Sequence, residues 1–279
     1  MPLLMDKKIA LESYLYGDDL DYSFDILDLE FWVDRIVMFP SLRPLKIEKV
    51  VRLCLFFRHN TDFCRELIKR AKDCVYLIFQ LYKRGFFEFN DFGKIISSCD
   101  SFIFCYYFRK DIINFDSFIL QKTKPPYIDE LFFKNLNEID LLIEYGFLPS
   151  SIEYCLKYDD VDVFKTINIY NHKYAKWSPF EWSTKPKSLD FLSFSGFFGS
   201  IKCFKFIMVN GNMINADVLA SVVCSGSFDL FHCCLNEQSP SADCLCKSSE
   251  FCHLSLLSFM IFMGIEVNSQ SENIFIIFV

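Results

Sequence analysis

The segment LSFSGFFGSIKCFKFIMVNGNMIN, from Leu192 to Asn215, recurs downstream with the same spacing of apolar residues and glycines. Its opening leucine recurs as Leu219 and Leu245, at intervals of 27 and 26 residues. Gly199 recurs as Gly226, in each case seven positions after the opening leucine. This pattern predicts two consecutive helices that bury their apolar faces against neighbouring copies. The sequence therefore predicts an all-α array of stacked helix pairs, an architecture that usually binds other molecules.

Four clear copies of this pattern are present. They open near residues 152, 192, 219 and 245, and a fainter fifth copy ends at Leu142 to Gly146. Two positions before each opening hydrophobe stands a residue suited to cap a helix, an interaction that contributes about 1 kcal/mol. These expected caps are Ser150, Asp190, Asp217 and Asp243. The residues expected in the core of the second helices are Val161, Phe164 and Ile167; Ile201, Phe204 and Ile207; Phe228, Phe231 and Cys234; and Leu254, Leu257 and Met260.

The residues before the array are also expected to be helical, although they do not keep the repeat spacing. The apolar pattern predicts helices at 25–39 and 45–57, one that follows Thr61 as its cap and ends near Gly85, and one around 94–108 rich in buried aromatic residues. Pro125 and Pro126 then interrupt the helical pattern, because proline lacks the amide that a helix interior needs. We therefore expect an irregular helical N-terminal region at 1–125 and the array at 126–279.

An insertion at 168–188 separates the first two clear copies. It contains the stretch KWSPFEWSTKP, with the aromatic residues Trp177, Phe180 and Trp182. Loops with several large rings usually fold onto their own domain, so we expect this segment to cover an otherwise bare helix pair. The alternative is that it clamps a ligand.

The segment 192–215 matches the general ankyrin pattern LHxAAxxGHxxIVxxLLxxGAxIN without a gap. The matching positions are Leu192, Gly199, Ile201, Ile207, Gly211, Ile214 and Asn215. The chain resembles the ankyrin-repeat superfamily, and more closely the divergent ankyrin-like proteins of parasitic flagellate protists, which carry a KWSPFEWS-type stretch. The resemblance covers about residues 130 to 268. It implies a helical-repeat solenoid that acts as a non-enzymatic protein–protein interaction scaffold, and it names no partner.

One departure from a regular ankyrin unit concerns the β-hairpin finger, which spans about ten residues between repeats. Only three residues separate Asn215 from Leu219. We therefore expect shortened or absent fingers, and any binding shifts to the groove side or to the N-terminal region.

The resemblance further implies that two residues near the end of each first helix face a concave groove. They are Lys157 and Tyr158, Phe197 and Phe198, Cys224 and Ser225, and Glu250 and Phe251. Exposed aromatic residues are typical anchors of protein interfaces. The expected protein-binding residues are Lys157, Tyr158, Phe197, Phe198, Glu250 and Phe251. The alternative is that the tryptophan loop or the N-terminal helices cover this strip.

Charge and motifs argue against most other functions. The net charge of −7 does not suit nucleic-acid binding, which needs a clustered basic surface. The basic residues nearest to such a cluster alternate with apolar ones, as on the solvated face of amphipathic helices: Lys49, Arg52, Arg65, Lys69, Arg70 and Lys72. No HExxH, phosphate-binding glycine loop or GxSxG motif occurs, so we expect no enzyme activity, no cofactor and no small-molecule substrate.

A structural zinc site is a less favoured alternative. Its candidate ligands are His232, Cys233, Cys234, Cys244, Cys246, Cys252 and His253. They include no CxxC pair, the spacing most typical of such sites.

Thirteen cysteines and an early charged sequence, MPLLMDKKIALE, indicate reduced thiols in the cytoplasm. No apolar stretch reaches the roughly 20 residues of a membrane span. After Asn268, the apolar run Ile274–Val279 stands where another repeat would begin. The alternative to a functional scaffold is therefore a truncated or decaying member of a repeat family.

Overall fold

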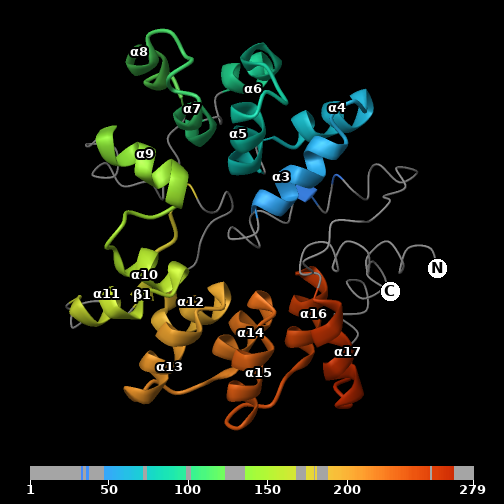
Figure 1. Cartoon of the computed structure of the whole chain (residues 1–279), viewed down its shortest axis with the longest axis vertical. Helices are drawn as coiled ribbons and strands as arrows, with labels where there is room; N and C mark the ends of the chain where they lie inside the picture. The colour runs from blue at the N-terminus through green and yellow to red at the C-terminus, as the bar shows by residue number, and fades with distance from the viewer. Residues whose placement is uncertain are drawn as a thin grey trace. The chain divides into compact units, whose positions relative to one another are not determined.

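The computed structural model (Figure 1) describes residues 33, 36–37, 47–71, 74–98, 102–122, 136–167, 174–178, 180, 188–251 and 253–266. Within these residues the chain is mainly helical. The strands in this part of the chain are β1 (Tyr174–Ala175) and β2 (Leu189–Asp190), which pair antiparallel. The all-α class expected from the sequence is thus confirmed.

The chain divides into two compact units. One contains the described residues of 149–176 and 187–279, and the other contains those of 25–148 and 177–186. The boundary expected at residues 125 and 126 lies outside the described residues and stays a prediction.

The first unit along the chain is built from short helices. Their bounds are α3 Ile47–Phe56, α4 Thr61–Lys69, α5 Val75–Lys83, the 3₁₀ helix η2 Phe89–Phe92, α6 Gly93–Ser97, α7 Phe102–Tyr107, α8 Phe115–Ile119 and α9 Leu136–Tyr145. The helix expected at 45–57 is present as α3. The single helices expected from Thr61 to Gly85 and around 94–108 are each two helices, a correction to the sequence-based assignment. The chain turns between α4 and α5, where Ala71 and Cys74 enter the core.

Aromatic rings fill the core of this unit. Phe92, Phe104 and Phe108 are buried, and their ring centroids lie 4.7 to 5.6 Å apart. Edge-to-face and offset contacts of this kind add to the free energy gained by burying the rings. The aromatic burial expected around 94–108 is therefore confirmed.

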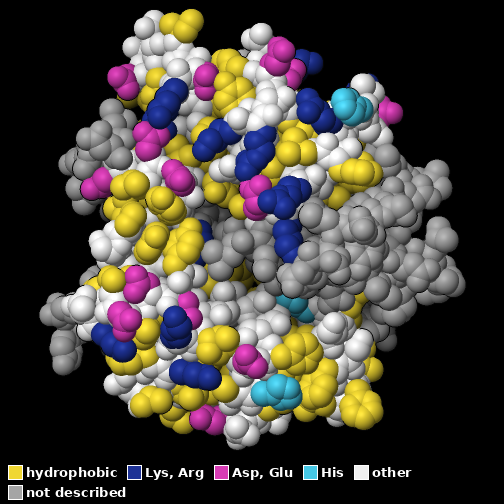
Figure 2. All heavy atoms as spheres, viewed as in Figure 1, with side chains coloured by type: hydrophobic (Ala, Val, Ile, Leu, Met, Phe, Trp, Pro, Cys, Tyr) yellow, Lys and Arg dark blue, Asp and Glu magenta, His cyan; other side chains and the backbone are white. Residues whose placement is uncertain are grey.

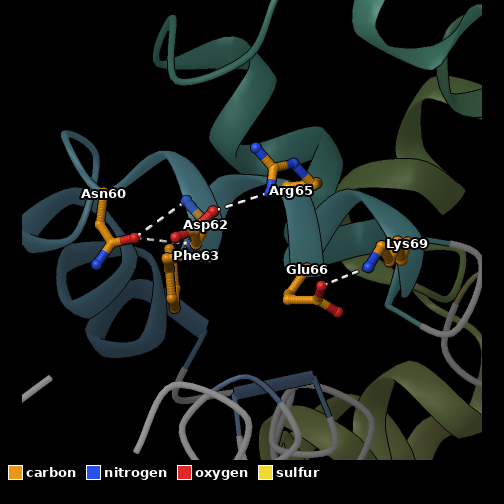
Figure 3. A network of polar contacts seen from close by, with 6 residues as sticks. All are labelled: Asn60, Asp62, Phe63, Arg65, Glu66 and Lys69. Carbon is orange, nitrogen blue, oxygen red and sulfur yellow. Dashed lines mark hydrogen bonds and ion pairs between the residues drawn. The ribbon is translucent and has the colours of Figure 1, made fainter. Parts of the chain in front are cut away.

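Helix α4 shows how the basic residues of this unit are accommodated (Figure 3). Asn60 caps the helix by accepting hydrogen bonds from the backbone amides of Asp62 and Phe63, so the cap is Asn60 and not Thr61. Arg65 pairs with Asp62 at 2.9 Å, and Lys69 pairs with Glu66. Among the basic residues considered above, Arg52, Arg65, Lys69 and Arg70 are exposed, as expected for a solvated face, whereas Lys49 is partly buried. Lys72 lies outside the described residues.

The second unit contains four consecutive helix pairs. They are α10 Ile152–Tyr158 with α11 Val161–Thr166, α12 Phe191–Phe198 with α13 Ile201–Val209, α14 Ala216–Ser225 with α15 Phe228–Leu235, and α16 Ala242–Glu250 with α17 Leu254–Phe262. The first helices pack against one another in chain order, from α10 to α12, α14 and α16 (Figure 1). We call α10–α17 the helix-pair stack. The loops 210–215 and 236–241 between pairs contain no strand, although all of their residues are described.

The turn inside each of the first three pairs has the same backbone conformation. Asp159, Gly199 and Gly226 stand seven positions after Ile152, Leu192 and Leu219 and have φ angles of 59°, 71° and 70°. This left-handed conformation ends a helix and is easiest for glycine. The glycine positions of the sequence pattern therefore mark the turns. The corresponding position in the last pair, Cys252, lies outside the described residues.

The expected helix caps are correct at only one of four positions. Asp190 caps α12 by accepting a hydrogen bond from the amide of Ser193. Helix α10 is capped by Ser151, α14 by Asn215, and α16 begins after Ser241, whose side chain makes no capping hydrogen bond. Ser150 therefore lies before its helix, whereas Asp217 and Asp243 lie in the first turns of α14 and α16. Carboxylates in a first turn still interact favourably with the helix dipole.

The second helices bury two of the three apolar residues expected in most copies. The buried residues are Phe164, Phe204, Ile207, Phe231, Cys234, Leu257 and Met260. The first residue of each set is only partly buried or exposed, and Phe228 is 37% exposed. Phe228 is therefore not a core residue, contrary to the expectation from the sequence.

Candidate functional site

The insertion between α11 and α12 folds back onto its own chain. Strand β1, inside the insertion, pairs with β2, which directly follows it, with Tyr174 opposite Asp190 and Ala175 opposite Leu189. Phe180 is buried, and the Tyr107 hydroxyl donates a 2.8 Å hydrogen bond to its carbonyl oxygen. The two rings also meet edge to face at 5.5 Å. Phe180 thus packs with the helical unit formed by 25–148, as a folded plug would, whereas Trp182 lies outside the described residues.

The residues expected in a groove lie at equivalent places in the structure. They occupy the carboxyl ends of the first helices α10, α12, α14 and α16, with Phe251 directly after α16. Their burial differs from that of an open binding strip. Phe197 and Phe198 are each 8% exposed, Phe251 is 3% exposed and Lys157 is 4% exposed.

Aromatic contacts account for part of this burial. The rings of Phe197 and Phe251 meet edge to face at 5.8 Å, and the Phe197 ring contacts that of Phe198 at 5.2 Å. These three rings therefore belong to the folded interior, which favours the alternative of a covered strip. Tyr158 is the exposed aromatic residue among those expected to bind protein, and Glu250 is partly exposed and paired with Lys247 at 2.8 Å.

Polar groups join the first and second pairs of the helix-pair stack. The Asp159 carboxylate accepts hydrogen bonds from the backbone amides of Lys202 and Cys203, at 3.2 and 2.9 Å. It therefore caps α13 from the preceding pair. Ser200 donates from its hydroxyl to the Leu156 carbonyl across the same junction. The left-handed turn at Asp159 thus holds the carboxylate at the start of the neighbouring helix.

Close backbone approach joins the later pairs. A Cβ atom on Gly196 would lie only 2.8 Å from the Cγ2 atom of Val222, so glycine allows α12 and α14 to meet closely. At the last junction, the His253 ring lies against Gly226, and its Nε2 atom is 3.1 Å from the Cys224 carbonyl oxygen. These contacts bind the pairs to one another and use the small residues that the sequence pattern places there.

The buried thiols are poorly suited to nucleophilic chemistry. Burial raises the pKa of Cys155 to about 11 and, together with the nearby Asp159 charge, that of Cys203 to about 12. Burial likewise raises the pKa of Cys234 to about 12. A nucleophilic cysteine reacts as the thiolate, and these groups are protonated at neutral pH.

The candidate zinc ligands do not converge in the described part of the chain. There, no three His, Cys, Asp or Glu side chains are arranged to hold a metal ion. His232 is exposed on α15, whereas His253 is buried against Gly226. Cys252 lies outside the described residues.

The structure shows a group of aromatic and apolar side chains, four of them exposed and Phe259 partly buried, that the sequence pattern did not identify. It comprises Phe228 and His232 on α15, Phe259 and Phe262 on α17, and Met263 directly after α17, and we call it the outer-face cluster. Phe259 contacts the rings of Phe228 and His232 at 6.1 and 5.6 Å, while Phe262 is 88% exposed. The signal lay in the sequence of α17, LSLLSFMIF, which is apolar on more faces than one buried side requires.

None of the helices that the structure describes combines the length and hydropathy needed to cross a membrane. Comparison with known proteins found no matching family model, no matching curated protein and no matching solved structure.

Proposed function

We propose that α10–α17 form an ankyrin-like repeat solenoid with shortened or absent fingers, and that the chain is a non-enzymatic protein–protein interaction scaffold. The observation that carries this proposal is the recurrence of one turn geometry inside the helix pairs. Three successive helix pairs turn through a left-handed residue at the same position, and the first helices pack in chain order. Stacked units of this kind present extended surfaces to partners.

Two further observations support a binding role over a catalytic one. The polar groups described at the junctions, Asp159 and Ser200, are engaged in helix capping and backbone contacts. The stack also exposes large apolar side chains, notably Phe262, which are costly to keep in water and are typical of interaction sites.

The eleven cysteines of the described residues are all free thiols, which supports a reducing compartment such as the cytoplasm.

Affinity capture with the full-length chain, followed by titration of the purified binder, tests this function. We expect at least one protein to bind saturably to the wild-type chain. Gly226→Ala is the control, because a clash with His253 should disturb the stack and weaken that binding. The proposed function is wrong if no protein binds saturably, or if the folded and the disturbed chains bind every protein equally.

A further inference from the structure

The outer-face cluster lies in the last two pairs of the helix-pair stack, which carry a negative net charge. Residues 216–266 contain six acidic residues and one basic residue, a net charge of −5. The acidic residues are Asp217, Asp229, Glu237, Asp243, Glu250 and Glu266, and the basic residue, Lys247, pairs with Glu250. Counted in the same way, with internal turns only, α14–α17 carry four acidic residues and one basic residue, whereas α10–α13 carry four acidic and four basic residues. The last two pairs are therefore acidic, and the first two are balanced.

Acidic residues lie in or just beyond the two helices that carry the cluster. Asp229 follows Phe228 in α15, Glu237 lies just beyond the end of α15, and Glu266 lies beyond the end of α17. All three are exposed. In Figure 2, hydrophobic side chains gather over α15 and α17 around a histidine, whereas the Lys side chains visible on the stack lie over α11 and α13.

The aromatic members are arranged along the two helices. Phe228 and His232 are four residues apart in α15, and Phe259 and Phe262 are three apart in α17, so each pair lies on one side of its helix. Phe259 contacts both residues of α15. The result is one largely apolar surface formed by two helices, with exposed carboxylates on these helices or a few residues beyond their ends.

We infer that the outer face of α15 and α17 is a docking surface for a basic amphipathic helix of a partner protein. Apolar side chains of such a helix would cover Phe228 and Phe262, and its Lys or Arg residues would meet the flanking carboxylates. Two copies of this chain would bring equal negative charges together, and nucleic acids and anionic lipid surfaces would be repelled. This inference rests on the proposed binding function and assigns it a surface.

The test uses full-length protein and a fluorescent, designed leucine–lysine amphipathic helix. Its controls are a leucine–glutamate helix with the same pattern and a scrambled leucine–lysine peptide. Fluorescence anisotropy should show that the leucine–lysine helix binds at least about tenfold more tightly than either control. Equal binding of the leucine–glutamate helix or of the scrambled peptide would overturn the inference.

Two kinds of variant locate the binding. Phe262→Ser should weaken binding of the leucine–lysine helix about tenfold, because an exposed aromatic anchor is lost. Val209→Ser is the matched control, since Val209 is 80% exposed on α13, away from the acidic pairs.

The combined variant Asp229→Asn, Glu237→Gln and Glu266→Gln should weaken binding at low salt and reduce its salt dependence. Circular dichroism establishes that each variant is folded; unchanged binding in Phe262→Ser or in the folded charge variant would overturn the inference.

Two further measurements separate the possible outcomes. Self-association of the wild-type chain in sedimentation equilibrium, abolished by Phe262→Ser, would identify a second copy as the occupant and overturn the inference. A captured protein that binds wild type and Phe262→Ser equally would also overturn this surface while leaving the proposed function intact. The absence of any saturable protein binder contradicts the proposed function instead.

Discussion

At the scale of single residues, two features of Gly226 disfavour any larger residue at this position. Its φ of 70° is disfavoured for other residues, and an added Cβ would lie 1.9 Å from Cε1 and 2.2 Å from Nδ1 of His253. Gly226→Ala should therefore lower the free energy of unfolding by about 3 kcal/mol or more, from backbone strain and overpacking together. Urea denaturation followed by circular dichroism measures this effect.

Gly211→Ala provides the matched control for that substitution. Gly211 also has a positive φ, of 91°, but an added Cβ would meet no atom within 4 Å. Its substitution should cost about 1 to 2 kcal/mol, from backbone strain alone. Equal costs at both positions would show that the His253 contact does not constrain the turn.

Buried thiols lower the stability of the helix-pair stack at high pH. Unfolded thiols ionise near their ordinary pKa of 9.0, whereas burial and the Asp159 charge raise the pKa of Cys203 to about 12. The unfolded chain therefore binds fewer protons between pH 9 and 12, and stability falls as pH rises through this window. Raising the pH from 8 to 10 should cost about 1 kcal/mol for this thiol.

Urea denaturation at both pH values checks this dependence. Cys203→Ala should lose less stability than wild type over the same interval, because it lacks the titrating thiol. Identical losses in the two proteins would show that Cys203 does not contribute to the pH dependence.

At the scale of helices, the approach of α12 to α14 depends on one missing methyl group. Gly196→Ala would place Cβ 2.8 Å from Cγ2 of Val222, so one helix or one side chain must move. The expected cost is about 1 to 3 kcal/mol. Adding Val222→Ala removes the opposing methyl groups, so the double variant should be less destabilised than the sum of the two single variants.

A double-mutant cycle measured by urea denaturation gives this coupling energy. A strictly additive result would mean that Gly196 and Val222 are not in contact across the two helices.

The positions of turns were more predictable from the sequence than the positions of helix starts. A glycine at a fixed distance from an apolar helix position indicates a left-handed turn, and Gly199 and Gly226 behave accordingly. Asp217 was misassigned as a cap because carboxylates stabilise both the cap position and the first turn. In the structure the cap of α14 is Asn215, and the sequence spacing alone does not distinguish the two positions.

Burial at the ends of the first helices was the least predictable feature. The sequence pattern placed Phe197 and Phe251 five and six residues after the opening leucines Leu192 and Leu245, but it did not show that the two rings contact each other. Such contacts depend on how successive helix pairs are oriented. The exposure of Phe228 was not predicted either, because its position in the pattern is apolar in every copy and so suggested burial.

At the scale of the whole molecule, the helix-pair stack combines similar turns within its pairs with different charges on them. The first two pairs carry balanced charge, whereas the last two carry a net charge of −3 and include exposed aromatic residues. In a stack, each pair packs mainly against its neighbours, so the exposed residues of one pair can differ without altering the packing of the others. This separation of packing from surface suits the proposed role as a binding scaffold.

Contacts between neighbouring pairs stabilise the stack of α10–α17. Hydrogen exchange of the full-length chain, comparing wild type with Gly226→Ala, measures this directly, because Gly226 and His253 lie at the last junction. We expect a loss of protection that is largest in α14–α17, with protection largely retained in α10–α13. An equal loss of protection in all eight helices, or no loss in α16 and α17, would contradict it.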